Sequence, residues 1–305
     1  ISEYGIQVAI FDYSTRFELE EVSEFIKRDI TKHSIKVIPL YGDYCGNSRL
    51  RKLLASIHTV IISKERFSHV KTNQSKGSWL AIILKLKNKN VRFLHRSGYC
   101  WSDFTWRLTG SRFKFFITRF LELIANLFAD EIHVASELDK KNMFEFEKRK
   151  TLIVPNWVNV QKVTKTKTKN ISILIGRFEK QKGIIELLNF WPEDENLILV
   201  GTGSLCNQIE MIIKKRKLLV KIKSPTKHSE LMKLLSSCKC LINWSDFEGN
   251  PKVILEALFC GVPVIAKDVP GVNEILRKGA FGGLVKDKHQ LFSALKRVVT
   301  MEIDE

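Results

Sequence analysis

Short apolar runs alternate with amphipathic segments through the first half of the chain. The runs are rich in β-branched and aromatic residues, and they predict strands at residues 6–11, 36–40, 59–63, 91–95 and 131–136. Apolar positions at helical spacing lie between several of them, as in ELEEVSEFIKRDI and FKFFITRFLELIANLF. Strands that alternate with helices indicate βαβ units, so we expect a mostly parallel sheet.

The second half repeats this pattern. Strands are predicted at residues 172–178, 197–204, 220–224, 240–245 and 263–268, with helical segments such as GIIELLNF and SELMKLLSSC between them. The segment QKVTKTKTKN (161–170) is polar, basic and free of apolar periodicity, which is typical of a linker. We therefore expect two α/β domains, residues 1–162 and 163–305. Ligands bind beyond the carboxyl ends of strands in such sheets, so residues that follow strands are candidates for a site.

Charge is the feature of the composition that changes the picture most. The chain has 50 Lys and Arg against 33 Asp and Glu, a formal net charge of +17, which attracts nucleic acids, acidic lipid headgroups or phosphorylated substrates. No apolar run is long enough to span a bilayer. The six cysteines show no zinc-ligand spacing, and we expect reduced thiols in a cytoplasmic protein, with no metal site.

The segment FEGNPKVILEALFCGVP carries the clearest candidate chemistry. Asn250 is a favourable N-cap and Pro251 suits the first helical position, while Gly261 can end the helix. The backbone N–H groups of Lys252 and Val253 would then be free at the helix start and, together with the helix dipole, would attract an anion.

Two glutamates, eight residues apart, accompany this helix. Glu248 lies in the turn before it, and Glu256 lies inside its apolar stretch. An ion pair between Glu256 and Lys252 is one interpretation, although Lys before Glu is the weaker orientation on a helix. The other is that the carboxylates accept hydrogen bonds from sugar hydroxyls: with a phosphate at the helix start, Glu256 would hold a ribose and Glu248 a second sugar.

These residues carry a resemblance. The Glu-x7-Glu segment EGNPKVILEALFCGVPVIA resembles the signature of the group 1 (family 4) glycosyltransferases, which have the GT-B fold. Similar family motifs occur in order at IVPNWVN (153–159), IGRFEKQKG (175–183) and VGTGS (200–204). The resemblance implies an α/β protein of GT-B architecture, with two Rossmann-like domains facing across a cleft. It also implies that Glu256 holds the nucleotide ribose, that Glu248 holds the donor sugar, and that Asn250, Pro251, Lys252 and Val253 lie against the donor.

Further site residues follow from the other motifs. Arg177 follows a strand and Lys182 precedes a helix, so both can neutralise the diphosphate leaving group in place of a metal ion, or else they are ordinary surface cations. By resemblance, the loop with Pro225 and Thr226 holds the nucleobase. Two glycines, Gly201 and Gly203, let the backbone approach the donor or simply form a tight turn.

The first half resembles the family less. The glycine-rich loop that the family usually has near its first strand is absent or lies upstream of residue 1. By resemblance His95, at a strand end, faces the cleft and contacts the donor sugar; a structural histidine is the alternative. The helix predicted at residues 113–128 is interpreted as a core helix, with docking at a membrane surface as the alternative.

We therefore expect a retaining, metal-independent glycosyltransferase that needs no cofactor. Its partners would be a UDP-sugar or GDP-sugar donor and a glycan or lipid-linked glycan acceptor, as in the synthesis of a bacterial-type surface polysaccharide. We expect it in the cytoplasm, also able to lie on an anionic membrane surface at the inner face. A non-catalytic subunit that binds nucleotide sugars is the first alternative. A basic nucleic-acid-binding protein is the second, but the chain lacks nucleic-acid-binding motifs, so no specific nucleic acid is expected.

Overall fold

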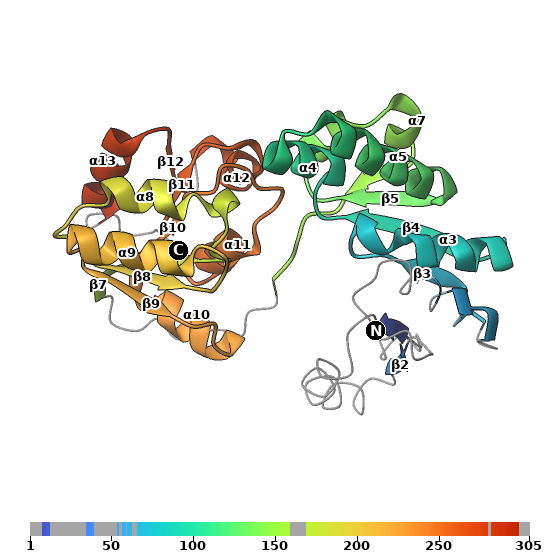
Figure 1. Ribbon diagram of the computed structural model, residues 1–305, viewed down its shortest axis with the longest axis horizontal. Coiled ribbons are helices and arrows are strands. Elements are labelled where there is room, and N and C mark those ends of the chain that lie inside the picture. The colour runs from blue at the N-terminus through green and yellow to red at the C-terminus, as the bar shows by residue number, and fades with distance from the viewer. Residues whose placement is uncertain are drawn as a thin grey trace. The chain divides into compact units, whose positions relative to one another are not determined.

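The computed structural model describes residues 8–12, 35–39, 54, 57–58, 60–62, 66–158, 169–279 and 282–298. Helices and strands alternate along the chain, as Figure 1 shows. The strand pairs whose register is defined in these residues all run parallel. The predicted α/β class with mostly parallel sheets is thus confirmed.

The first half contains a two-stranded and a four-stranded sheet. The strands are β1 (Val8–Asp12) and β2 (Ile35–Pro39), then β3 (His69–Lys71), β4 (Arg92–Ser97), β5 (Glu131–Val134) and β6 (Thr151–Ile153) in the order β3-β4-β5-β6. The helical elements are η2 (Ser75–Gly77), α3 (Ser78–Lys87), α4 (Trp101–Thr109), α5 (Arg112–Phe128), α6 (Glu137–Lys141) and α7 (Glu145–Lys148).

One predicted strand of this half is wrong. Residues 60–62, within the run predicted as a strand at 59–63, are helical. Only Val60 of these three is buried, against Leu80 and Leu84, whereas its neighbours Ile61 and Ile62 are 67% and 53% exposed. The β-branched composition suggested a strand, but packing of a single side chain against α3 suits a helical turn. Strands β3 and β6 were not predicted, and the helix predicted at residues 18–30 lies outside the described residues.

A six-stranded parallel sheet organises the second half. Its strands are β7 (Lys169–Ile175), β8 (Leu197–Val200), β9 (Val220–Lys223), β10 (Cys238–Asn243), β11 (Val264–Lys267) and β12 (Gly283–Val285), in the order β12-β11-β10-β7-β8-β9. The chain passes from β7 through β8 to β9 at one edge of the sheet. It then crosses to β10, on the other side of β7, and continues through β11 to β12 at the opposite edge. The order therefore reverses between β7 and β10, the switch point at which doubly wound sheets bind ligands.

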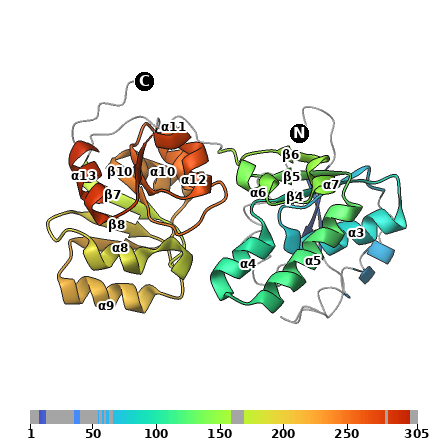
Figure 2. The same cartoon turned by 90° about the horizontal axis from the view of Figure 1, so that it is seen from above.

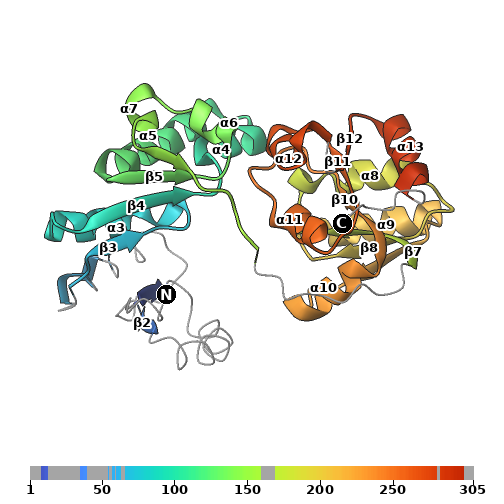
Figure 3. The same ribbon diagram turned by 180° about the vertical axis from the view of Figure 1, so that it is seen from behind.

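Helices cover both faces of this sheet, as Figure 2 shows. They are η3 (Lys180–Lys182), α8 (Ile184–Phe190), α9 (Cys206–Arg216), α10 (His228–Ser236), α11 (Lys252–Phe259), α12 (Pro270–Ile275), η4 (Arg277–Gly279) and α13 (Lys288–Val298). Alternate strand residues belong to two separate apolar clusters, because successive side chains of a strand point to opposite faces. Leu174 packs with α8, α9 and α13, and Ile173 packs with α10, α11 and α12. Helices α11 and α12 lie side by side (Figure 3).

The chain forms two compact units. The first contains residues 1–96 and 121–131, and the second contains residues 97–120 and 132–305. The predicted domain boundary between residues 162 and 163 lies outside the described residues and stays a prediction. Within the described ranges, no helix combines the length and the apolar content that crossing a membrane requires.

Candidate active site

The second unit contains a cavity of about 640 Å³ beside the switch point of the six-stranded sheet. Its lining comes partly from the loops after β7 and β10 and from the start of α11. The lining residues predicted from sequence are Arg177, Lys182, Glu248, Pro251, Lys252, Val253 and Glu256. Arg177 and Glu256, which are 79 positions apart in the chain, thus line the same opening.

An ion pair joins two of these residues. Lys182 Nζ lies 2.5 Å from Glu248 Oε1, and the two side chains are only 17% and 11% exposed. Lys182 is the last residue of η3, and Glu248 follows β10. Arg177, directly after Gly176 at the end of β7, is exposed and lines the same cavity. The structure therefore brings the two predicted cations and the first predicted carboxylate together.

Backbone contacts fix the loop that carries Glu248. The backbone N–H of Asp246 donates to the carbonyl of Gln181 at 2.9 Å, and Gln181 Nε2 donates to the carbonyl of Phe247 at 2.8 Å. On the other side, a Cβ added to Gly271 would overlap the carbonyl oxygens of Glu248 and Gly249. This close approach requires glycine at 271, and together these contacts hold the loop against both η3 and α12.

The start of α11 differs from the prediction by one residue. The helix begins at Lys252, and Pro251, with φ −70° and ψ 116°, occupies the N-cap position. Asn250 is therefore not the N-cap: its Oδ1 accepts a hydrogen bond from the backbone N–H of Asn156 at 2.8 Å. Asn156 Nδ2 donates in return to the carbonyl of Asn250 at 2.6 Å. This reciprocal pair connects the predicted motif at residues 153–159 to the loop before α11.

Glu256 lies on α11 and does not pair with Lys252. Its Oε1 is instead 3.0 Å from Nε2 of His228, the first residue of α10, and its side chain is only 13% exposed. His228 ends the loop in which the nucleobase contact was predicted. Pro225 and Thr226 are exposed in that loop and are not among the residues that line the cavity, so their contact with a base stays a prediction.

The two glycines after β8 pack against backbone. A Cβ on Gly201, which has φ 155°, would overlap the carbonyl of Gly176, and one on Gly203 would lie 2.5 Å from the carbonyl of Phe178. Both glycines thus allow the β8 loop to approach the β7 loop. Backbone packing thus explains why Gly201 and Gly203 are glycines. Their contact with a donor stays a prediction.

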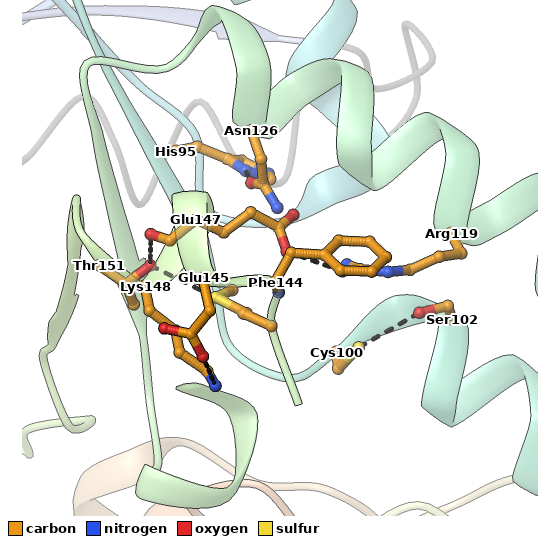
Figure 4. A network of polar contacts seen from close by, with 11 residues as sticks. His95, Cys100, Ser102, Arg119, Asn126, Phe144, Glu145, Glu147, Lys148 and Thr151 are labelled. Carbon is orange, nitrogen blue, oxygen red and sulfur yellow. Dashed lines mark hydrogen bonds and ion pairs between the residues drawn. The ribbon is translucent and has the colours of Figure 1, made fainter. Parts of the chain in front are cut away.

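His95 belongs to the first unit. It lies on β4 and is 1% exposed, and its Nδ1 is 2.6 Å from Oδ1 of Asn126 on α5 (Figure 4). This bond fits the structural interpretation. The predicted contact of His95 with the donor sugar stays a prediction.

Aromatic side chains that the sequence did not indicate also line the cavity. Phe104 on α4 packs edge to face against Phe247, with ring centroids 5.1 Å apart, and its ring lies 4.6 Å from that of Tyr99. The Arg107 guanidinium lies 5.8 Å from the centroid of the Phe247 ring. Contacts between residues more than 100 positions apart leave no local pattern, so no sequence signal indicated them.

Asp139 is a buried acid in this cavity that the sequence did not indicate. It is 8% exposed, and burial raises its pKa above the ordinary range. The hydroxyl of Ser136 at 2.6 Å and the backbone N–H of Cys100 at 3.0 Å both donate to its carboxylate. Ser136 is also the N-cap of α6, since its Oγ accepts from the backbone N–H of Asp139.

Comparison with known proteins agrees with this geometry. Residues 156–304 match the sequence model of the family described as glycosyl transferases group 1. An uncharacterised glycosyltransferase of Methanocaldococcus jannaschii is 29% identical over 163 residues, which are 53% of this chain and 46% of that protein. The Escherichia coli UDP-Gal:α-D-GlcNAc-diphosphoundecaprenol α-1,3-galactosyltransferase is 23% identical over 86% of this chain and 73% of its own length.

A solved structure shows the same fold. HepE of Anabaena, in complex with UDP and glucose, superimposes with a TM-score of 0.71 at 17% identity, over 96% of this chain and 89% of that one. Residues 156–304 of this chain therefore resemble the group 1 glycosyltransferases, and the architecture of the chain is GT-B, as the sequence predicted. The match to the first relative spans less than half of that protein.

Proposed function

We propose that the protein transfers a sugar from a UDP-sugar to a glycan or lipid-linked glycan, with retention of anomeric configuration and without a metal ion or other cofactor. One observation carries the proposal: Glu248 and Glu256 line the same cavity as Arg177, Lys182 and the first turn of α11. Two carboxylates for sugar hydroxyls and a cluster of positive groups for a diphosphate match the two chemical halves of a nucleotide sugar.

The positive groups would receive the diphosphate. Arg177 and Lys182 carry full charges, and the amide N–H groups of Lys252 and Val253 at the start of α11 add partial positive charge. Negative charge grows on the diphosphate as its bond to the sugar breaks, so preorganised cations stabilise the transition state more than the ground state. These groups would supply the neutralisation that other enzymes obtain from a divalent cation.

The carboxylates would orient the sugars. Glu256 is five residues into the helix from Lys252, counting both ends, which suits a ribose attached to a phosphate at the helix start. Glu248 would accept hydrogen bonds from hydroxyls of the transferred sugar. Its ion pair with Lys182 would hold the carboxylate in place until the donor binds. Charge-assisted hydrogen bonds of this kind are stronger than neutral ones.

Retention would follow from attack on the face that the diphosphate leaves. The C1–O bond to the diphosphate breaks and its electron pair goes to the diphosphate oxygen. The acceptor hydroxyl oxygen bonds to C1 from the same face, and its proton passes to that diphosphate oxygen. No protein carboxylate forms a covalent intermediate in this scheme, and the cations that bind the diphosphate also keep it in position to take the proton.

Two relatives support the choice of substrates. The structure of HepE contains UDP and glucose, and the name of the Escherichia coli relative specifies UDP-galactose and a sugar on diphosphoundecaprenol. A GDP-sugar remains the competing donor.

The test is a donor-consumption assay followed by NMR. The protein is incubated with UDP-sugars and, separately, GDP-sugars, with a diphosphate-linked lipid sugar as acceptor and with a chelator present. We expect a product whose anomeric configuration equals that of the donor, at a rate that the chelator leaves unchanged. An inverted product would contradict the mechanism, and loss of activity with chelator would contradict metal independence. Donor binding with no consumption by the complete protein would favour a non-catalytic subunit.

A further inference from the structure

Helix α5 exposes several large apolar side chains and buries polar side chains on its other side. The side chains that face the rest of the chain include Thr118, Glu122 and Asn126, which are 8%, 4% and 2% exposed. Several large apolar side chains face outward: Phe113 is 74% exposed and Phe120 61%. A helix of a globular protein normally buries its apolar stripe. The interpretation of residues 113–128 as a core helix is therefore wrong for this side of α5.

The outward side chains form one stripe. Phe113, Phe116, Ile117 and Phe120 follow the i, i+3, i+4, i+7 spacing that places residues on the same face of a helix. All four are more than 40% exposed. Two further exposed side chains, on α4, precede the stripe, and we call the six residues together the α4–α5 apolar face: Trp106, Leu108, Phe113, Phe116, Ile117 and Phe120.

Aromatic contacts connect the two helices of this face. The ring centroid of Trp106 on α4 is 6.3 Å from that of Phe115 on α5, and Phe115 is 5.6 Å from Phe116, both in edge-to-face geometry. In Figure 2, α5 continues directly from α4. Trp106 on α4 is thus connected to the α5 stripe through Phe115.

A buried ion pair fixes the orientation of α5. Arg119 NH2 donates to Glu147 Oε2 at 2.7 Å, with Glu147 fully buried, and the Arg119 guanidinium lies 4.7 Å from the centroid of the Phe144 ring (Figure 4). The same Glu147 oxygen accepts from the backbone N–H of Phe144 at 2.7 Å. Rotating α5 to bury the phenylalanines would break this pair and leave a charge buried, which is strongly unfavourable. The apolar face thus stays outward.

Charge identifies what covers the face. Of the four cations in residues 104–121, Arg107 pairs with Asp103 and Arg119 pairs with Glu147, which leaves Arg112 and Lys114. Arg112 and Lys114 are exposed, have no ion-pair partner among the described residues, and lie about 100° to either side of Phe113 on a helix of 3.6 residues per turn. Cations at both borders of an aromatic stripe are the arrangement in which long side chains reach lipid phosphates while the rings enter the acyl boundary.

We propose that the α4–α5 apolar face docks the protein on an anionic lipid bilayer, with the phenylalanines in the interface and Arg112 and Lys114 against the headgroups. The net charge of +17 acts in the same direction at longer range. This inference concerns a surface separate from the donor residues, so it does not depend on the proposed transfer reaction.

The test is flotation of the full chain with phosphatidylcholine vesicles, with and without phosphatidylglycerol. We expect binding to the anionic vesicles only. Replacing the three outward phenylalanines by serine (Phe113→Ser, Phe116→Ser, Phe120→Ser) should weaken vesicle binding at least about ten-fold, because the bilayer then buries less apolar surface. The double variant Arg112→Gln, Lys114→Gln should weaken it about 25-fold, since each cation near an anionic surface contributes about five-fold.

Matched controls come from α9. Met211→Ser removes an apolar side chain that is 70% exposed, and Lys214→Gln with Lys215→Gln removes two exposed cations; these variants should bind like the wild type, apart from a small loss from the lower net charge. The proposal is wrong if the wild type floats with neither vesicle or if the phenylalanine variant binds as well as the wild type. If the wild type does not bind vesicles but forms a dimer, and the phenylalanine variant is a monomer, the face instead binds a second copy of the chain.

Discussion

Lys182 and Glu248 form a nearly buried ion pair, 2.5 Å between Nζ and Oε1, at the switch point of the six-stranded sheet. Each residue was predicted from its own motif, 66 positions apart in the chain. Their pairing means that neither is an ordinary surface charge. It also means that each holds the other in place before a ligand binds.

Lys182→Met should lower kcat about 100-fold if this cation stabilises the departing diphosphate. Methionine keeps much of the apolar stem, so the loss reports the charge. Lys180→Met, which removes an exposed cation of the same 3₁₀ helix, is the matched control and should keep wild-type activity. Steady-state kinetics on the preferred donor measures both. Equal kcat values for the two variants would remove Lys182 from the proposed chemistry.

His228 is expected to act as a positioning residue for Glu256, because its Nε2 lies 3.0 Å from the Glu256 carboxylate. His228→Ala should raise the donor KM a few-fold and change kcat little, since the carboxylate then has more rotamers to lose on binding. His228→Gln, which can still donate to Glu256, should restore most of the affinity. A KM that stays unchanged in both variants would leave His228 without this role.

Gly271→Ala should destabilise the protein by about 2 kcal/mol or more, because the new Cβ would overlap two backbone carbonyls that cannot move independently. The same displacement would shift Glu248 and weaken donor binding. Gly77→Ala is the control, since no atom lies within 4 Å of a Cβ built there. Urea unfolding measures the stability of both. A Gly271 variant as stable as the control would show that the loop before α11 is not held by α12.

The buried Asp139 predicts a pH dependence of stability. Burial raises its folded pKa above the ordinary value of 3.8, so the folded state holds the proton more tightly than the unfolded state. The stability that Asp139 contributes is therefore present below about pH 4 and is lost as the pH rises through the folded pKa. Asp139→Asn, whose Oδ1 can still accept from the Cys100 N–H while its Nδ2 donates to Ser136 Oγ, should unfold at higher urea than the wild type at pH 7.

The control for this prediction is the same comparison at lower pH. The advantage of Asp139→Asn should shrink as the pH falls and level off below the unfolded pKa of 3.8, where the wild-type carboxyl is protonated in both states. A variant that is less stable than the wild type at pH 7, by a margin that grows with pH, would mean that the hydrogen bonds outweigh the cost of burying the charge.

Local pattern was enough to predict the six-stranded sheet. The central strands are apolar runs bounded by glycine, proline or polar residues, and both faces of the sheet are covered, so nearly all of the residues in β8, β10 and β11 are buried, whereas the edge strand β9 is largely exposed. The four-residue strand β8, for example, is buried throughout. The helix α11 was predicted within one residue of each end, because Pro251 and Gly261 mark where it starts and stops.

Long-range contacts decided what the sequence did not predict. Asn250 looked like an N-cap, but its Oδ1 accepts from Asn156, 94 positions away. An ion pair with Lys252 was one interpretation of Glu256, but the carboxylate instead lies 3.0 Å from Nε2 of His228 on another helix. The run at 59–63 looked like a strand because β-branched composition cannot show that two of its side chains face outward. Local propensity yields to tertiary packing in each case.

The central claim is that the cavity at α11 binds a nucleoside diphosphate, and calorimetric titration with UDP and GDP tests it most directly. The titrations use the wild type, Glu256→Ala, and Glu230→Ala as a matched control that removes an exposed acid of α10. We predict micromolar binding of UDP without added metal, unchanged in Glu230→Ala and weakened at least ten-fold in Glu256→Ala, since a charge-assisted hydrogen bond contributes about 1.5 kcal/mol or more. Preferential binding of GDP would change only the predicted nucleobase of the donor, from uracil to guanine. No binding of either nucleotide by the wild type, or equal binding by Glu256→Ala and the control, would contradict the account.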